Sequence, residues 1–216
     1  MKKLGENTGN IIFVVGVVLV LLIILGVNMV VNNKNSEKQD NNLLSGKHYV
    51  EVIVKDYGNM VLELDADTAP ITVTNFINLV NDKFYDGLTF HRIIDGFMVQ
   101  GGDPEGTGMG GSSQKIKGEF SQNGVKNDIS HVRGTVSMAR SSDSYDSASS
   151  QFFIVHKDST FLDGGYAAFG KVVNGIEIVD KLVGVKVEDD NGTVLAKNQP
   201  VIESIRVIDV AETSNK

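Results

Sequence analysis

The stretch FHRIIDGFMVQGGDPEGTGMGG, Phe90 to Gly111, joins two short apolar runs to a segment that is dense in glycine. The pair Asp95-Gly96 between the runs is typical of a tight turn that folds two strands into a hairpin. Each run carries one polar side chain that is unusual in such a setting, Arg92 in the first and Gln100 in the second. The pattern predicts two paired strands that present a guanidinium and an amide beside a loop with few side chains.

The register of this hairpin decides whether the two polar groups can share a site. An ideal two-residue turn would pair Arg92 with Val99 and would turn Gln100 to the opposite face of the sheet. A bulge or a twist near Phe97 would bring both polar side chains to one face. A common site therefore requires an irregular hairpin.

Outside this stretch, most of the chain has the pattern of short strands. Residues 48–65 alternate apolar and polar positions around the segment DYGN, which predicts another hairpin. Further apolar runs cover residues 88–94, 97–100, 134–139, 151–156 and 167–172, and residues 200–210 alternate again. Many short strands without a strand–helix–strand rhythm predict a mostly β fold, an antiparallel sheet closed into a barrel.

Two segments have a helical period instead. Apolar residues recur at the spacing i, i+3, i+4 and i+7 at Val73, Phe76, Ile77 and Val80. Pro70 suits the first turn of this helix, and Gly87 lies beyond its end. The segment GIEIVDKLVG, residues 175–184, predicts a second and shorter helix. We therefore expect two α-helices that cap the sheet.

Composition excludes several classes of function. The chain has 216 residues, no cysteine and a net charge of −7. Disulfides, thiolate chemistry and cysteine-bound zinc are thereby excluded. The negative charge and the lack of a basic cluster argue against a nucleic-acid partner. The four histidines form no i, i+4 pair, so no metal site is expected.

A long apolar segment precedes the folded part. Residues 11–31, IIFVVGVVLVLLIILGVNMVV, carry no charge and match the roughly 20 apolar residues that a spanning helix needs. Lys2 and Lys3 favour a cytoplasmic N-terminus. We expect a single-pass signal-anchor in the cytoplasmic membrane, with the folded domain on the extracytoplasmic side. A cleaved signal, which would release a secreted protein, is the alternative, although no A-x-A-like cleavage site follows.

A polar segment links this anchor to the domain. Residues 32–47, NNKNSEKQDNNLLSGK, are too polar to bury themselves and predict a flexible tether. The expected organisation is a cytoplasmic leader (1–10), a transmembrane signal-anchor (11–31), the tether (32–47), a folded domain (48–212) and a tail (213–216).

Two local motifs resemble catalytic signatures but lack their context. GTGMGG, Gly106 to Gly111, matches G-x-G-x-x-G, yet no helical pattern follows it, as a dinucleotide site requires. SSQK, Ser112 to Lys115, matches S-x-x-K, but the companion motifs of penicillin-binding enzymes are absent. We expect neither nucleotide binding nor acyl transfer. The NGT sequon at Asn191 is better explained as part of the turn DDNG.

The remaining polar residues define a different kind of site. Arg92 and Gln100 are joined by a second glutamine, Gln151, which precedes two phenylalanines, and by the aromatic segment FLDGGYAAFG, residues 161–170. Such a set offers apolar walls, a few neutral polar groups and one fixed cation, without a nucleophile, a base or a metal. It suits reshaping a ligand rather than breaking a bond in it.

Three blocks of the sequence carry a specific resemblance. FHRIIDGFMVQGGDPEGTGMGG, GTVSMARSSDSYDSASSQFFIVH and FLDGGYAAFGKVVNGIEIVDKL resemble the signature blocks of the cyclophilins, a family of peptidyl-prolyl cis–trans isomerases. The resemblance extends from about Tyr49 to Val210. It implies a closed eight-stranded antiparallel barrel with a helix over each end, and a surface groove that binds X-Pro segments of unfolded or exported polypeptides.

The resemblance also assigns roles. It implies that Arg92 and Gln100 are catalytic, and that the substrate-binding residues are Phe97, Met98, Ala139, Arg140, Gln151, Phe153, Phe161, Leu162 and Tyr166. It implies no cofactor, and we expect a monomer. Phe161 stands where well-known eukaryotic members have tryptophan, Tyr166 where they have histidine and Arg140 where they have asparagine. These differences resemble bacterial members.

The expected function is isomerisation of prolyl bonds, which would accelerate the folding of exported proteins outside the cytoplasmic membrane. The alternative is a module that binds proline-containing segments, or a chaperone, with little isomerase turnover. The retained Arg92, Gln100 and Phe153 favour the enzyme.

Overall fold

The computed structural model describes residues 43–209 of the chain. The predicted leader, the predicted signal-anchor, most of the tether and the tail lie outside this range. Among the described residues, no helix combines the length and the apolar character that crossing a bilayer requires.

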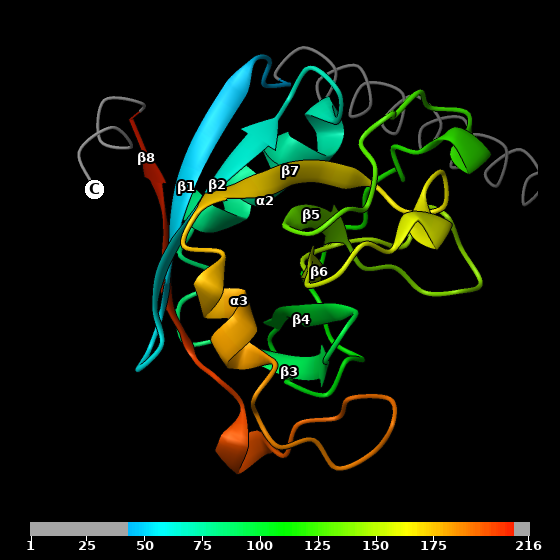
Figure 1. Ribbon diagram of the computed structural model, residues 1–216. Coiled ribbons are helices and arrows are strands. Elements are labelled where there is room, and N and C mark those ends of the chain that lie inside the picture. The colour runs from blue at the N-terminus through cyan, green and yellow to red at the C-terminus, as the bar shows by residue number, and fades with distance from the viewer. Residues whose placement is uncertain (1–42, 210–216) are drawn as a thin grey trace, which may run out of the picture. The chain divides into compact units, whose positions relative to one another are not determined.

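The described chain forms one antiparallel sheet of eight strands in the order β3-β4-β6-β5-β7-β2-β1-β8. β8 lies beside β1, although the two strands come from opposite ends of the domain (Figure 1). The strands are β1 Lys47–Val54, β2 Gly58–Asp65, β3 Thr89–Ile94, β4 Met98–Asp103, β5 Thr135–Met138, β6 Phe152–Val155, β7 Ala168–Asn174 and β8 Ile202–Ile208. The predicted hairpins and the mostly β architecture are confirmed.

The predicted closure into a complete barrel is wrong, because the sheet is a half-barrel. Its edge strands β3 and β8 form no ladder with each other, and an isolated bridge joins Thr89 of β3 to Val201, the residue just before β8. Beyond that point β3 pairs with the segment that precedes β8 instead of with β8 itself. The N–H of Ile93 donates to the carbonyl of Gly192 at 2.8 Å, and the N–H of Val194 donates to the carbonyl of His91 at 3.0 Å. An irregular segment therefore occupies the position that the closing ladder would need.

The two predicted α-helices are confirmed as α2, Pro70–Asn81, and α3, Glu177–Leu182. Both bury apolar side chains against the sheet, and Pro70 starts α2 as expected. The buried apolar side chains are Val73, Phe76, Ile77 and Val80 of α2, and Ile178, Val179 and Leu182 of α3. Three short 3-10 helices were not predicted: Ser121–Asn123, Thr160–Leu162 and Ala196–Asn198.

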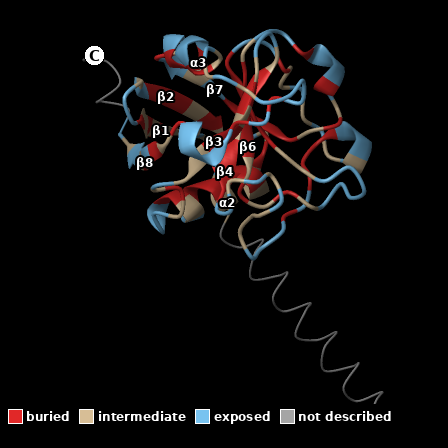
Figure 2. Cartoon of the chain, turned by 90° about the horizontal axis from the view of Figure 1, so that it is seen from below, coloured by how far each residue is buried: buried red, intermediate tan, exposed pale blue. Residues whose placement is uncertain are grey.

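The core lies between the concave side of the sheet and the helices. Figure 2 shows buried residues concentrated in the strands and exposed residues in the loops and on the outer sides of the helices. Phe76 of α2 is central, with ring centroids 5.0 Å from Tyr85, 5.5 Å from Phe152 and 5.2 Å from Phe169. Such tilted and edge-on aromatic contacts add stabilisation beyond area burial. The core fixes the sheet on which the site is built.

A distant carboxylate caps the start of α2. Ala69 stands at the N-cap and offers no side-chain acceptor to the first N–H groups of the helix. Glu119, 2% exposed, accepts from the N–H of Ile71 at 3.0 Å and from the N–H of Thr72 at 2.7 Å. The hydroxyl of Thr72 donates to the same carboxylate at 2.6 Å. This contact ties the helix to the segment that follows the glycine-dense loop.

We expect Glu119→Ala to lower the free energy of unfolding by about 2 kcal/mol, because it leaves buried helix N–H groups without an acceptor. Glu119→Gln keeps one oxygen and should lose less. Urea denaturation measures both, with Glu203→Ala, an exposed glutamate of β8, as the control. A Glu119→Ala midpoint equal to that of the control would contradict the capping role.

Candidate active site

The β3–β4 hairpin places Arg92 directly opposite Gln100. Ile94 pairs with Met98, so the turn holds three residues, Asp95, Gly96 and Phe97, rather than two. Gly96 has a φ of 74°, a left-handed value that glycine adopts without strain, and the N–H of Phe97 donates to the carbonyl of Ile94 at 3.1 Å. The additional turn residue is Phe97, and a register shift between Phe90 and Arg92 adds a bulge. The irregular hairpin that a common site requires is therefore present.

The Arg92 guanidinium is fixed from two sides. Its Nη1 donates to Gln100 Oε1 at 3.2 Å. Its Nε donates to the carbonyl of Asn191 at 2.8 Å, and its Nη2 donates to Asn191 Oδ1 at 3.1 Å. Burial lowers the pKa of Arg92, but a guanidinium remains protonated. Among the described residues Arg92 takes part in no ion pair, although the nearby Asp189 carboxylate acts on its charge from a longer distance.

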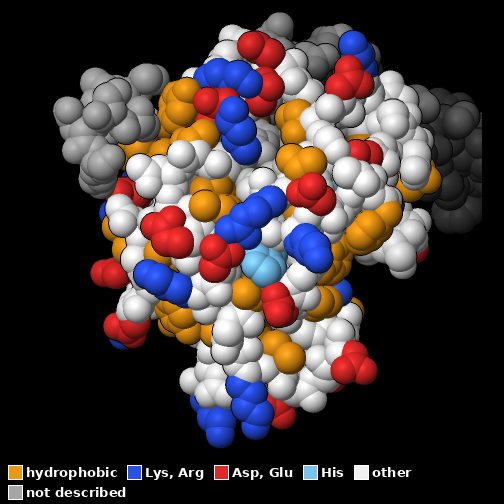
Figure 3. All heavy atoms as spheres, in the orientation of Figure 1, with side chains coloured by type: hydrophobic (Ala, Val, Ile, Leu, Met, Phe, Trp, Pro, Cys, Tyr) orange, Lys and Arg blue, Asp and Glu red, His pale blue; other side chains and the backbone are white. Residues whose placement is uncertain are grey.

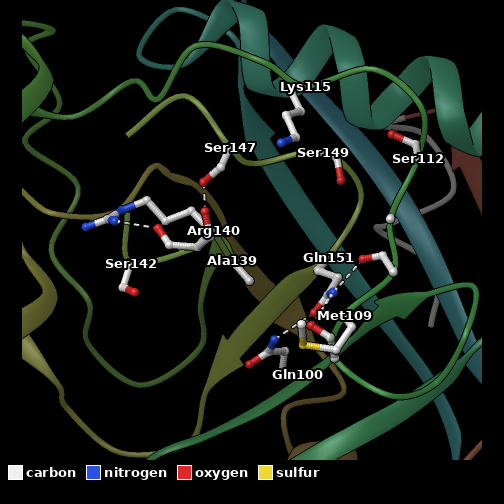
Figure 4. A pocket seen from close by; sticks show the side chains of 14 residues that line it. Gln100, Met109, Ser112, Lys115, Ala139, Arg140, Ser142, Ser147, Ser149 and Gln151 are labelled. Atoms are coloured by element: carbon white, nitrogen blue, oxygen red, sulfur yellow. Dashed lines mark hydrogen bonds between the residues drawn. The ribbon is translucent and has the colours of Figure 1, made fainter. Parts of the chain in front are cut away.

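A relay of amides extends from Gln100 to the glycine-dense loop. Gln100 Nε2 donates to Gln151 Oε1 at 2.8 Å. Gln151 Nε2 in turn donates to the carbonyls of Gly108 at 3.1 Å and Gly110 at 2.7 Å. Figure 4 shows the two glutamine side chains meeting at one end of a pocket. Both neutral amides are thereby held in a single orientation.

The glycine-dense loop is organised by a buried carboxylate. Asp103, 1% exposed, accepts from the N–H groups of Glu105, Thr107, Gly108 and Gly110 at 2.8, 3.0, 2.6 and 3.3 Å. Burial favours the neutral acid, but these donors outweigh burial and hold the pKa of Asp103 below its usual range. A Cβ at position 110 would lie 2.2 Å from Asp103 Oδ1. The glycines thus serve close backbone approach, and no helix follows the loop.

An apolar cluster of side chains lies next to the relay. The predicted residues Met98, Phe153 and Leu162 lie in a cluster separate from the main core, with the predicted Phe97, Ala139 and Tyr166 packed against it. Val155 and Ile94, which were not predicted, belong to the same cluster. Phe161 lies at the rim, 76% exposed, with its ring centroid 5.6 Å from that of Phe97. The structure therefore brings Phe97, Met98, Phe153, Leu162 and Tyr166 together, and it leaves Phe161 facing solvent.

A histidine packs behind the apolar cluster, against Phe153. The His131 ring stacks on the Phe153 ring with centroids 5.9 Å apart. His131 Nδ1 lies 2.8 Å from Asp163 Oδ1, and its Nε2 lies 3.0 Å from Ser137 Oγ. The side chain is buried, and burial, opposed by Asp163, lowers the pKa of His131. A neutral imidazole therefore backs Phe153.

A polar pocket of about 540 Å³ lies on the other side of the amide relay (Figure 4). Gln100, Gln151 and Ala139 line it together with backbone of the glycine-dense loop and several serines. Arg140, predicted to bind substrate through its backbone, also borders this pocket. Its guanidinium points away from the two glutamines. Among the described residues, the N–H of Arg140 has no hydrogen-bond partner.

Sequence reasoning missed three contributors to the site. Asn191 was assigned only to a turn, Asp103 was given no role, and His131 was treated as one of four scattered histidines. The turn is present, with the N–H of Gly192 donating to the carbonyl of Asp189 at 3.0 Å, and it also brings Asn191 into contact with Arg92. The Asn191-Gly192 dipeptide indicated a turn in the sequence, but its position next to Arg92 is visible only in the structure.

The comparisons agree with this geometry. Residues 49–210 match the family described as cyclophilin type peptidyl-prolyl cis-trans isomerase/CLD. The chain is 44% identical over 161 residues to peptidyl-prolyl cis-trans isomerase A of Dickeya dadantii, which covers 70% of this chain and 80% of the relative. It is 44% identical over 130 residues to peptidyl-prolyl cis-trans isomerase B of Bacillus subtilis, which covers 60% of this chain and 87% of the relative.

Solved structures give the same result. A cyclophilin type peptidyl-prolyl cis-trans isomerase of Cryptosporidium parvum superposes with a TM-score of 0.67 at 29% identity, covering 76% of this chain and 99% of that one. A structure of the same relative in the presence of the dipeptide Ala-Pro gives a TM-score of 0.66 at 30% identity, covering 74% of this chain and 99% of that one. The chain belongs to the cyclophilin-type peptidyl-prolyl cis–trans isomerases.

Figure 3 shows one face of the molecule, on which basic and acidic side chains are interspersed. This face presents no extended surface of one sign. The expectation that nucleic acid is not a partner remains a prediction.

The buried His131 predicts acid sensitivity. Its folded-state pKa lies below its ordinary value, so between the two the unfolded chain binds more protons, and stability is lost as pH falls through that interval. His91 is also buried, and burial lowers its pKa, so it too makes the folded chain less stable as the pH falls. We expect the urea midpoint of the wild type to decrease as the pH is lowered from about 7.5 to about 5.5. The urea midpoint of His131→Gln should decrease less over the same range. Parallel pH profiles for wild type and His131→Gln would contradict this assignment.

Proposed function

We propose that the groove formed by the amide relay and the apolar cluster isomerises X-Pro bonds with Arg92 as the catalytic group. The observation that carries this proposal is the Arg92 guanidinium, which is held by Gln100 and Asn191 beside the apolar cluster and forms no ion pair with a described carboxylate. Belonging to an isomerase family supports the reaction class.

The chemistry follows from proline itself. The peptide bond resists rotation by about 18–20 kcal/mol, because its nitrogen shares a lone pair with the carbonyl. Proline has no N–H, so its nitrogen becomes a hydrogen-bond acceptor only when rotation breaks that resonance. A guanidinium aimed at this nitrogen stabilises the twisted state more than the planar one, which lowers the barrier. Arginine suits this role since it cannot deprotonate and act as a base.

The other residues would hold the substrate. The apolar cluster around Phe153 would bind the pyrrolidine ring while the carbonyl side rotates. Gln100, Gln151 and the backbone of Ala139 and Arg140 would hydrogen-bond the substrate backbone, and the unpartnered N–H of Arg140 suits this. The relative whose structure was determined in the presence of the dipeptide Ala-Pro supports a proline-containing peptide as the substrate.

We further propose that the domain acts outside the cytoplasmic membrane. The apolar segment 11–31 and the polar segment 32–47 support an anchor and a tether. A domain held there would meet exported chains as they emerge, before slow prolyl isomerisation has finished. No cofactor is required by this chemistry.

Arg92→Ala should lower kcat/KM on a proline-containing peptide by on the order of a hundredfold, the scale seen when one transition-state donor is removed. The circular dichroism spectrum should remain that of the wild type, because Arg92 is only half-buried. Turnover is measured with the full-length chain in detergent. A folded variant with undiminished kcat/KM would reject the role and would favour a binding module.

Gln100→Ala and Asn191→Ala should lose less activity, because each removes a group that orients Arg92 and not the charge itself. One hydrogen bond is worth about 0.5–1.5 kcal/mol, which corresponds to roughly a twofold to thirteenfold loss. Asn78→Ala, an exposed asparagine of α2, is the matched control and should match the wild type.

Location is tested with intact cells or spheroplasts. Added protease should remove the isomerase domain, and the apolar segment should stay with the membrane fraction. Full-length protein that remains protected until lysis would reverse the topology. A mature N-terminus between residues 28 and 42 would instead establish a cleaved signal and a secreted enzyme.

A further inference from the structure

We propose that Arg140 is a positioning residue whose side chain holds the substrate-binding backbone and Tyr166 in place together. This role depends on the proposed groove and goes beyond it, because the residue has been considered so far only for its backbone. Three independent segments meet at its guanidinium, and none of them contributes a carboxylate.

The first observation is an aromatic enclosure. Arg140 Cζ lies 4.7 Å from the ring centroid of Tyr166, 5.0 Å from that of Tyr145 and 5.5 Å from that of Phe120. Phe120 belongs to the buried core, Tyr145 to an exposed loop and Tyr166 to the apolar cluster. Cations within about 6 Å of a ring face are attracted to it. One cation thus bridges the core, a surface loop and the apolar cluster.

The second observation is a pair of hydrogen bonds to backbone. Arg140 Nε donates to the carbonyl of Gly165 at 2.9 Å, and its Nη1 donates to the carbonyl of Ser141 at 2.9 Å. Gly165 directly precedes Tyr166, and Ser141 directly follows Arg140. The side chain therefore fixes both the chain that carries Tyr166 and its own backbone.

The third observation is that the loop beyond Arg140 is closed on itself. The N–H of Ser141 donates to Ser147 Oγ at 3.0 Å, and Ser147 Oγ donates to the carbonyl of Ser144 at 2.8 Å. Asp146 accepts from the N–H of Gly118 at 3.0 Å. The loop is thereby joined to the segment next to Phe120. Arg140 stands where these connections converge.

The consequence for substrate is positional. Tyr166 contacts Phe153 edge-on with centroids 6.0 Å apart, so its placement shapes the apolar cluster. The N–H of Arg140 is unpartnered among the described residues, so its backbone is available to substrate. A group that fixes both would support the planar and the twisted substrate alike. Uniform binding of this kind lowers KM and leaves kcat unchanged.

Lysine cannot replace arginine here, because an ammonium has neither the planar face that stacks on rings nor the forked donors. Arg140→Lys should raise KM for a proline-containing peptide about tenfold, equivalent to about 1.4 kcal/mol, with kcat within about twofold of wild type. The dissociation constant, from an NMR titration of the full-length chain, should weaken in parallel. The control is Arg206→Lys on β8, which loses one of the two hydrogen bonds from Arg206 to Asp86 and should leave KM unchanged.

Tyr145→Leu provides a second variant, since it removes one ring from an exposed loop. It should raise KM in the same direction, and its effect should be less than additive with Arg140→Lys. Unchanged peptide affinity in a folded Arg140→Lys chain would overturn the proposal, even if Arg92→Ala confirmed the catalytic role. A loss confined to kcat would also overturn it. Conversely, a KM effect of Arg140→Lys would stand if Arg92 proved dispensable.

Discussion

The carboxylate of Asp103 is the constraint on which the rest of the site depends. It is buried, and it satisfies its charge with backbone N–H groups of a loop that has almost no side chains of its own. Once the loop is fixed, its carbonyls orient Gln151, which orients Gln100, which orients Arg92. A single buried anion is thus connected to the Arg92 guanidinium through neutral groups alone.

The groups that contact the Arg92 guanidinium are uncharged, and this affects how much of its charge remains available. A carboxylate next to Arg92 would fix the guanidinium equally well, but it would cancel much of its charge, and in a half-buried setting that cancellation would be strong. Amide and carbonyl oxygens from Gln100 and Asn191 orient the group and leave its field available. Burial removes part of the hydration of the cation, and this lowers the pKa of Arg92. The buried carboxylate of Asp103 is connected to Arg92 only indirectly, through Gln100, Gln151 and the glycine-dense loop.

The sequence predicted what depends on local pattern. Alternation and helical spacing located the strands and both helices, and the polar residues in apolar runs identified Arg92, Gln100 and Gln151. The pattern failed where distant segments meet. Glu119 caps a helix 47 positions away, Asn191 reaches Arg92 across 99 positions, and neither pairing leaves a periodic trace. Closure of the barrel was predicted wrongly, because nothing local shows that the segment before β8 pairs with β3.

The segment that precedes β8 also affects whether another chain can pair with the edge of the sheet. A bare strand at the edge of a sheet is a template on which an extended chain can add itself by backbone hydrogen bonds, whatever its sequence. β3 carries Arg92, so a strand added at this edge would lie directly beside the candidate site. By pairing with β3 through Gly192 and Val194, the segment removes that template next to the groove. Addition of a further strand beside Arg92 is thereby disfavoured.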